Sequence, residues 1–506
     1  MNRCFQRFFA TLGQYSNLAL ALIGSFSLAL YLALSRLEPN RIAAALYFFL
    51  AILAALFLLL LLAAMIVKEK SFQDNPRWSF GIIIAFAVLF RLTLPGQSPW
   101  LSNDVNRYLW DAQLVDHGVN PYLFPPASDT LAGFREATIY PKMDHKNVHS
   151  VYPPFLQLLF WSGRKISQLF NLPFFAGLKL IFALADIGLV LALFRLLVRM
   201  NLDIRWSILY AWHPLPIIEI AGSGHTDGVG ALMLLLALIF LLQRKYFFAT
   251  IFLALGFLVK FITVLFLPFL CAAVWKEVSL KKACLAAMLF GLIIAGAYAP
   301  FAGAGEKLIS GLMIYSDKWR FNDGFFSLVF SGIHRLLPEW LVIDLMIPPG
   351  WEINETALIT RRIDLALMIA KIIAGGFFML IYIRLLQRIL KPGASRSASL
   401  WIASFIIILA AFFLLAPTLQ PWYLIWLLPL LCLSPMIENF KIAGSMIVPL
   451  WLFSATIFLS YGVLQTYILS GVWREPGWVK WVEYGFPFLV WVVNCETDRS
   501  LKAVEL

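Results

Sequence analysis

Long apolar segments separated by short polar connections run along most of this chain. Runs such as Ile42–Val67 and Leu178–Leu197 can cross a bilayer, because about 20 residues of helix span its hydrocarbon layer. The pattern predicts about thirteen membrane helices, and it leaves a fourteenth open at 481–495, where Glu483 interrupts a short apolar stretch. The predicted spans lie near residues 16–35, 42–67, 80–95, 174–198, 206–221, 227–243, 246–259, 261–275, 282–299, 363–387, 399–416, 421–436 and 441–461.

The composition supports an all-α polytopic membrane protein. Of the 506 residues, 61% are hydrophobic and 13% are charged, whereas soluble domains average about 25% charged residues. The net charge of +12 does not indicate a nucleic-acid partner, because the basic residues fall between apolar segments instead of forming one patch. The five scattered cysteines show neither metal-type spacing nor a disulfide framework.

The basic residues also predict an orientation. The connections predicted to be cytoplasmic hold eighteen Lys and Arg residues, and the short outer connections hold three. The two long polar intervals, 96–173 and 300–362, then lie outside the cytoplasm. We expect one catalytic domain, with an added helical hairpin at 1–75 and further helices at 363–506. Residues 152–169 are expected to lie on the outer face, and whether they cross the membrane stays open.

The polar stretch Ser102–Tyr122 predicts a capped helix within the first outer interval. Ser102 or Asn103 can accept backbone N–H groups at its start, and Gly118 with Pro121 ends it. Asp104 falls in the first turn, and Arg107 and Asp111 follow on the same face. In an arbitrary protein this would be a capped surface helix with solvated charges. Its place between membrane segments makes it a candidate site.

A glycine-rich connection holds Glu219, His225 and Asp227. Gly222, Gly224 and Gly228 allow a tight turn and let a ligand approach the backbone. A helix that begins after His225 would offer free N–H groups to an anion. An ordinary turn with a capping Asp explains the pattern equally well.

Lys260 lies near the middle of the apolar run Tyr246–Trp275. A charge at the centre of one span costs about 2.5–3.5 kcal/mol on insertion scales. We therefore expect two shorter helices that meet at Lys260, with the ammonium at the outer interface. There it either snorkels to the headgroups or binds a lipid-linked phosphate.

Two aromatic clusters complete the outer candidates. In the second interval, Lys318 or Arg320 suits a phosphate, Trp319 suits a sugar face, and Asn322 follows. The same cluster is also typical of an interfacial aromatic belt. For Trp422 and Tyr423 on a tight outer turn, the belt is the preferred interpretation unless a site lies nearby.

The order of these motifs resembles a known superfamily. N-D-V-N-R-Y-L-W-D-x6-G-V-N-P-Y, V-Y-P-P-F, W-H-P-x4-E-x4-G-H-T-D-G, L-V-K-F-x6-P, K-W-x-F-N and Q-P-W-Y-L-x-W-x-L-P follow one another from about Leu94 to Pro429. The set resembles the GT-C integral-membrane glycosyltransferases, in particular the prokaryotic polyprenyl-phosphate-mannose-dependent mannosyltransferases and their relatives of the GPI-mannosyltransferase kind. The resemblance implies a sugar donor carried on a polyprenyl monophosphate, reaction at the outer leaflet and inversion of the anomeric centre.

The resemblance also assigns roles. Asp104 stands at the position of the general base, although this chain has Asp-Val-Asn where some relatives have two acids. From the chemistry of a departing monophosphate, Lys260, Arg320 and His225 are expected to hold the donor phosphate, and Arg107 is expected either to contact the phosphate or to keep Asp104 ionised. Because protein cations supply this charge, no cofactor is expected to be required, and no metal ligands are assigned. The sugar and acceptor would contact the remaining candidates, which are Asp111, Tyr152, Asp227, Lys318, Trp319, Asn322, Trp422 and Tyr423.

The expected partners are the lipid-linked sugar donor, a glycan, lipid or protein acceptor, and membrane lipids, without nucleic acid. The expected location is a bacterial inner membrane, with the active site on the periplasmic or extracellular side. The main alternative is a lipid or solute transporter whose outer loops form a gate and whose acids and Lys260 couple ions.

Overall fold

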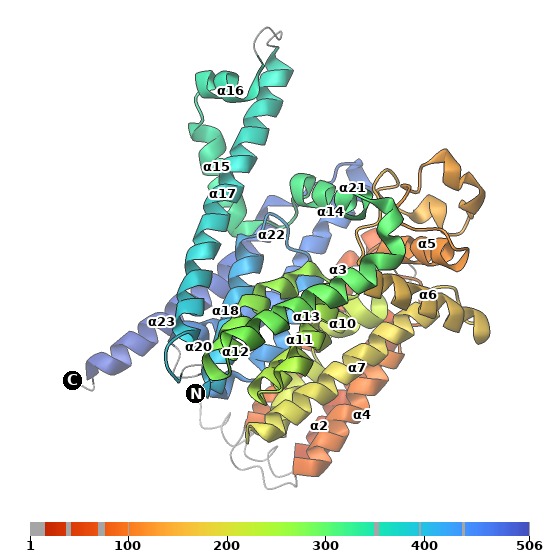
Figure 1. The fold of residues 1–506 in the computed structure, drawn as a ribbon. Coiled ribbons are helices and arrows are strands. Elements are labelled where there is room, and N and C mark those ends of the chain that lie inside the picture. The colour runs from red at the N-terminus through yellow and green to blue at the C-terminus, as the bar shows by residue number, and fades with distance from the viewer. Residues whose placement is uncertain are drawn as a thin grey trace.

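The computed structural model is a bundle of helices with helical loops gathered at one end (Figure 1). It describes residues 16–36, 42–68, 76–99, 101–348, 354–393, 396–437 and 441–504. All regular structure in these ranges is helical, and Phe321 and Thr418 form an isolated parallel bridge. The predicted all-helical class is therefore confirmed.

Long helices form where the apolar runs are uninterrupted. Apolar residues on all sides suit a helix that is surrounded by lipid or by other helices. The long helices are α2 (Ser16–Leu34), α3 (Ile42–Lys68), α4 (Pro76–Leu92), α7 (Ala176–Arg199), α13 (Leu280–Tyr298), α17 (Glu355–Ile389), α18 (Ala398–Leu415), α20 (Lys441–Thr456) and α23 (Phe486–Val504).

The expected number of thirteen spans is not confirmed. Among the described residues, seven helices are long and apolar enough to cross a membrane. The number is eight if the bent pair α15 (Gly324–Leu336) and α16 (Glu339–Met346) is one span. The apolar helices α10 (Asp227–Leu242) and α11 (Tyr246–Phe257) are shorter.

Three other predicted spans are divided into short pieces. Proline lacks the N–H that continues a helix, and it stands at the start of several of these pieces. The pieces are η4 (Ile204–Ser207), α8 (Ile208–Ala211), α9 (Pro214–Pro216) and the π-helix η5 (Ile217–Gly222); η6 (Phe261–Phe266) and α12 (Leu267–Glu277); and η9 (Pro421–Trp426), α19 (Leu428–Leu431) and η10 (Ser434–Met436).

The first long interval folds over one end of the bundle. It contains α5 (Asp104–Asp116), η2 (Asp129–Phe134), η3 (Tyr140–Lys142) and α6 (Pro154–Leu169). Helix α6 has 16 residues and contacts both α5 and α7. Arg164 and Lys165 on α6 pair with Asp116 at the end of α5. These ion pairs attach α6 to the same end of the bundle as α5.

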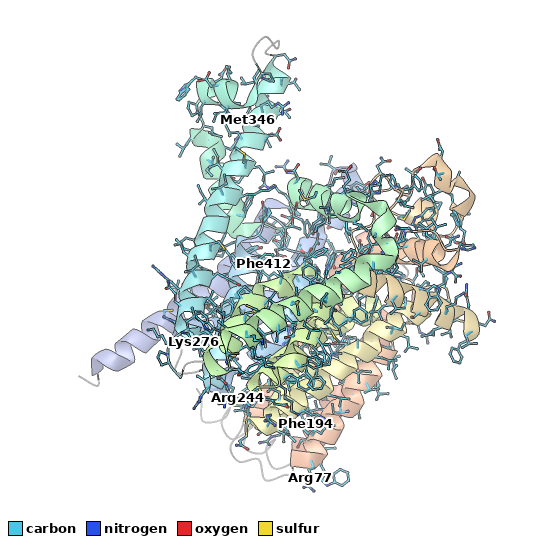
Figure 2. All side chains as sticks on the ribbon, viewed as in Figure 1. Arg77, Phe194, Arg244, Lys276, Met346 and Phe412 are labelled. Carbon is cyan, nitrogen blue, oxygen red and sulfur yellow. The ribbon has the colours of Figure 1, made fainter. Side chains whose placement is uncertain are left out.

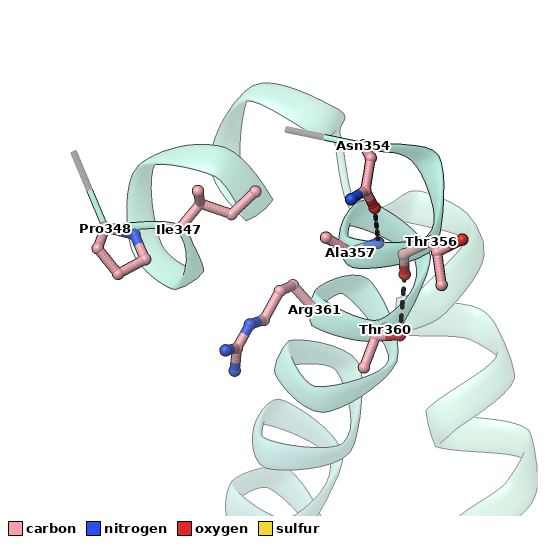
Figure 3. A pocket seen from close by; sticks show the side chains of 7 residues that line it. All are labelled: Ile347, Pro348, Asn354, Thr356, Ala357, Thr360 and Arg361. Atoms are coloured by element: carbon pink, nitrogen blue, oxygen red, sulfur yellow. Dashed lines mark hydrogen bonds between the residues drawn. The ribbon is translucent and has the colours of Figure 1, made fainter. Parts of the chain in front are cut away.

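The second interval contains η7 (Ala299–Ala304), α14 (Lys307–Lys318) and an arm made by α15, α16 and the first half of α17 (Figure 1). A pocket at the tip of the arm is lined by Ile347, Pro348, Asn354, Thr356, Ala357, Thr360 and Arg361 (Figure 3). Two of the lining side chains stabilise the start of α17. Asn354 accepts a hydrogen bond from the Ala357 N–H, and Thr360 donates one to the Thr356 carbonyl. The pocket is therefore a poor candidate for the catalytic site.

The C-terminal segment contains η11 (Ile457–Tyr461), α21 (Gly462–Ser470), α22 (Gly477–Lys480) and the π-helix η12 (Trp481–Gly485), which leads into α23. It contacts the second interval where Lys480 pairs with Asp323. Figure 2 shows Arg77, Arg244 and Lys276 at the lower end of the bundle, whereas Met346 marks the opposite end. These three basic residues, from connections predicted to be cytoplasmic, therefore lie away from α5 and α14.

Gly230 on α10 lets the Trp426 ring approach the helix, and an added Cβ would lie 2.2 Å from that ring. We expect Gly230→Ala to lower the melting temperature in detergent, because overpacking costs about 1–3 kcal/mol and exceeds the helix-propensity gain of about 1 kcal/mol. Gly291→Ala on α13 is the matched control, since nothing lies within 4 Å of its Cβ position. Equal melting temperatures for the two variants would contradict this packing argument.

Candidate active site

Asp104 begins α5, as the capped-helix pattern predicts. The Ser102 hydroxyl accepts a hydrogen bond from the Asp104 N–H at 3.2 Å, while the Asn103 side chain makes no cap bond. Gly118 follows the helix end with φ +72°, a conformation that glycine adopts readily. The 42% exposed side chain of Asp104 is thus held at a helix N-terminus and remains open to a ligand.

His225 faces Asp104 from the glycine-rich connection between η5 and α10. Its Nε2 lies 3.7 Å from Asp104 Oδ2, and its Nδ1 lies 2.9 Å from Glu219 Oε2. The indole of Trp422 stacks on the imidazole with ring centroids 3.6 Å apart. His225 therefore lies buried between two carboxylates, with one ring face covered by Trp422.

Glu219 is fully buried and also accepts a hydrogen bond from the Tyr461 hydroxyl at 2.7 Å. A buried carboxylate is stable only where donors satisfy its oxygens. Sequence reasoning placed Glu219 in the motif but gave it no role, and it did not find Tyr461. The spacing of five residues between Glu219 and His225 was the sequence pattern that could have indicated a role for Glu219.

Lys260 lies at the break between α11 and η6, so the predicted meeting of two shorter helices is confirmed. Its ammonium donates to Asp227 Oδ1 at 2.7 Å and lies 3.8 Å from the centre of the Tyr423 ring. Asp227 also accepts from the Trp426 indole at 2.7 Å. The Lys260 side chain is 31% exposed, so its remaining protons can meet a ligand.

Burial and nearby basic side chains act in opposite directions on the pKa of Asp104. Loss of solvation raises the pKa of the Asp104 carboxyl, and the charge of Asp144 adds to this effect. His225, Lys260 and His145 lower the pKa of Asp104 in opposition. The carboxyl of Asp104 is therefore a stronger base than an ordinary aspartate, with the Lys260 ammonium and the His225 imidazole nearby.

Aromatic residues of the second interval lie beside Tyr423 at the candidate site. The hydroxyls of Tyr315 and Tyr423 lie 2.6 Å apart, and Trp319 packs against Tyr315 with ring centroids 5.3 Å apart. Trp319 also contacts the His145 ring from the first interval at 4.5 Å. The Lys318 side chain lies outside the described part of the structure. Sequence reasoning placed Tyr315 at the start of this cluster but gave it no role, and it missed His145, which no local pattern marks.

Tyr152 lies beside α5, where its ring meets Tyr108 edge-on at 4.8 Å. Burial raises the pKa of Tyr152, and the nearby charge of Asp104 raises it further. The phenol of Tyr152 therefore stays protonated near the carboxylate. This position is compatible with sugar recognition.

Arg107 and Asp111 form an ion pair within α5, with Nε and Oδ1 2.9 Å apart. Arg107 also donates to the Val148 carbonyl at 2.9 Å, and Asp111 accepts from Ser150 and from Gln157. These bonds attach the loop before α6 to α5. The Asp111 carboxylate is therefore satisfied within the fold, whereas the buried Nη2 of Arg107 has no hydrogen-bond partner among the described residues.

Arg320 and Asn322 belong to a second cluster with the C-terminal segment. Arg320 pairs with Asp323 at 2.6 Å, and Lys480 binds the other oxygen of Asp323 at 2.6 Å. Asn322 is buried, and its N–H donates to Glu475 at 2.9 Å. The candidate cations are thus divided between two groups, with Lys260 and His225 beside Asp104.

In the described ranges, no three His, Cys, Asp or Glu residues are arranged to hold a metal ion.

A hollow lies beside the start of α5. It is lined by Ser98, Pro99, Asn103, Val105, Asn106, Lys142, Phe174 and Phe175.

The comparisons identify the family. No curated protein matches the chain. Residues 11–276 match the family described as "Alpha-(1->6)-mannopyranosyltransferase, N-terminal domain". This range is more than half of the chain, and it includes Asp104, Glu219, His225 and Lys260 as well as the N-terminal hairpin. The chain therefore belongs to the alpha-(1->6)-mannopyranosyltransferase family, which consists of prokaryotic membrane mannosyltransferases of the GT-C type.

Proposed function

We propose that this glycosyltransferase moves mannose from a polyprenyl-monophosphate donor to an acceptor hydroxyl at the outer face of the membrane, with Asp104 as the general base. The observation that carries the proposal is the approach of His225 to Asp104, with Trp422 stacked on His225 and with Lys260, whose charge acts on Asp104, placed over the Tyr423 ring. A base, a cation and aromatic surfaces are the groups that transfer from a sugar phosphate requires.

Lys260 is the proposed contact for the donor phosphate. Negative charge concentrates on the phosphate as the bond to the anomeric carbon breaks, and a nearby ammonium stabilises that charge. The polyprenyl tail would stay in the membrane and confine the sugar to the interface, which pre-orients it for attack. Trp319, Tyr152, Asp227, Trp422 and Tyr423 are proposed to line the sugar and acceptor positions.

Direct displacement by the acceptor hydroxyl inverts the anomeric centre. The family description names an α-(1->6) linkage, and inversion gives that linkage only from a β-linked donor. We therefore propose a β-linked mannosyl donor and the 6-hydroxyl of a mannoside as acceptor. The uneven distribution of Lys and Arg supports a reaction on the side opposite the cytoplasm.

The test uses the full chain in sealed vesicles with polyprenyl-phosphate-β-mannose and a water-soluble mannoside, and mass spectrometry with linkage analysis detects the product. We expect an α-(1->6) product in right-side-out vesicles without detergent, and no product from the α-linked donor or from a nucleotide-linked mannose. Transfer from the nucleotide donor alone would overturn the donor assignment. Transfer only after right-side-out vesicles are opened would overturn the sidedness.

The raised pKa of Asp104 predicts the pH dependence of transfer. Only the ionised carboxylate can accept the hydroxyl proton, so the rate falls as the pH drops through the pKa of Asp104. Because the pKa of Asp104 is raised, the acidic limb should lie above about pH 4, the ordinary range of an aspartate. A kcat profile that stays flat down to that pH would contradict a base role for Asp104.

A further inference from the structure

Glu219 is a buried acid whose described charged partner is His225. Both of its oxygens are engaged, one by His225 Nδ1 at 2.9 Å and the other by the Tyr461 hydroxyl at 2.7 Å. An ionised carboxylate can only accept hydrogen bonds. With Glu219 ionised, the Nδ1 of His225 carries the hydrogen that Glu219 accepts, and we assign the ring this tautomer.

The opposite nitrogen, Nε2, consequently points to Asp104. Nε2 has no hydrogen-bond partner in the described structure, and His225 is 1% exposed. Its nearest ionisable neighbour on that side is Asp104 Oδ2 at 3.7 Å. Catalytic hydrogen bonds are often long before the substrate binds and then shorten. The unpartnered nitrogen is therefore positioned to exchange a proton with Asp104.

We propose that Glu219 is a positioning residue that holds His225 so that Nε2 accepts, from Asp104, the proton that Asp104 removes from the acceptor hydroxyl. The inference rests on the proposed function and deepens it. The acceptor oxygen bonds to the anomeric carbon while its O–H bond breaks, and the phosphate oxygen leaves with the electron pair of the sugar bond. The proton passes from Asp104 Oδ2 to His225 Nε2, which restores the carboxylate.

A phosphate contact for His225 fits the arrangement less well. Carboxylates face both of its nitrogens and Trp422 covers one ring face, so a phosphate would meet negative charge at either edge. Lys260, paired with Asp227, offers a partly exposed cation instead. The other cation near this loop is Lys179 on α7, and its ammonium donates to the carbonyls of Leu94 and Gln97.

The test is the pH profile of the Glu219→Gln variant with the donor that the wild-type protein uses. The change keeps the shape and removes the charge, which makes His225 a weaker base. The proposed transfer needs both an ionised Asp104 and an unprotonated Nε2, so the acidic limb reports this pair. We expect kcat to fall at least about tenfold, the donor KM to stay within about threefold, and the acidic limb to move to lower pH. If the wild-type protein uses another donor, the proposed polyprenyl-phosphate donor is wrong. The pH profiles of wild type and Glu219→Gln, measured with the donor that is used, still test the role of Glu219.

Tyr461→Phe gives a second measurement that does not depend on the folding of Glu219→Gln. It removes one of the two donors that share the Glu219 charge, so His225 becomes a stronger base and the acidic limb should move to higher pH. Ser454→Ala is the matched control, because it removes the hydroxyl beside Nε2 of the other buried histidine, His213, at 2.8 Å. Its pH profile should match the wild type.

Two results would overturn the inference. A rise in donor KM, with movement of the basic limb alone, would make His225 a phosphate-binding cation. Lower melting temperatures with unmoved pH profiles would reduce Glu219 and Tyr461 to structural roles.

Discussion

Asp104→Asn is expected to lower kcat for mannosyl transfer by about 10³-fold, within the range of 10²–10⁴ that a general base contributes. The amide has the same shape as the carboxylate but cannot take the hydroxyl proton. The Ser102 contact to the backbone of residue 104 survives the change. The donor KM should therefore change little, and steady-state kinetics with the lipid-linked donor would separate the two parameters.

Asp116→Asn provides the control at the other end of the same helix. Asp116 pairs with Arg164 and Lys165 on α6 and accepts from the Trp161 indole. Its loss should reduce stability slightly, since partly exposed ion pairs contribute about 0–1 kcal/mol, and leave kcat near the wild-type value. If both variants transfer mannose at full rate, Asp104 is not the base.

The position of Asp104 could be predicted from the sequence because the signals are local. A capping hydroxyl two residues before an acid, and a glycine that ends the helix, fix the limits of α5 without tertiary information. The break at Lys260 was predictable for a similar reason, because a charge within a long apolar run is costly in the membrane. Both predictions depend on neighbours within a few turns.

The partners of these residues were not predictable in the same way. Tyr461 reaches Glu219 across 242 positions of the chain, and Trp426 reaches Asp227 across 199 positions. Periodicity within a segment carries no information about such contacts. Arg320 is partly a local case, because its guanidinium pairs with Asp323 three positions later, but Lys480 reaches the same carboxylate across 157 positions.

The number of membrane spans shows a different limit. Hydropathy detects an apolar segment, but it does not reveal whether prolines divide that segment into pieces too short to cross. Segments 206–221 and 421–436 are apolar, and both are divided into short helical pieces. These broken segments supply Glu219 and Trp422. The helix breaks that make the predicted number of membrane spans too high therefore also place residues in the candidate site.

Lys260→Met is expected to lower kcat/KM for the donor by about 10²–10³-fold, the loss measured when one donor to a developing negative charge is removed. The ammonium would no longer meet the phosphate as the sugar bond breaks. The variant should also melt at a lower temperature, because Asp227 would keep only the Trp426 hydrogen bond for a buried carboxylate. Kinetics and thermal unfolding of the same preparation would record both effects.

The double variant Lys260→Met/Asp227→Asn separates these two effects. Removing both charges relieves the unpaired carboxylate, so the melting temperature should return toward the wild-type value while transfer stays low. If activity returned together with stability, Lys260 would serve only to neutralise Asp227, and another cation would have to bind the phosphate. Arg320 would then be the first to test, although it would have to leave Asp323 to reach the donor. Loss of transfer in a stable double variant, with transfer retained in Asp227→Asn alone, would instead show that the ammonium acts on the substrate.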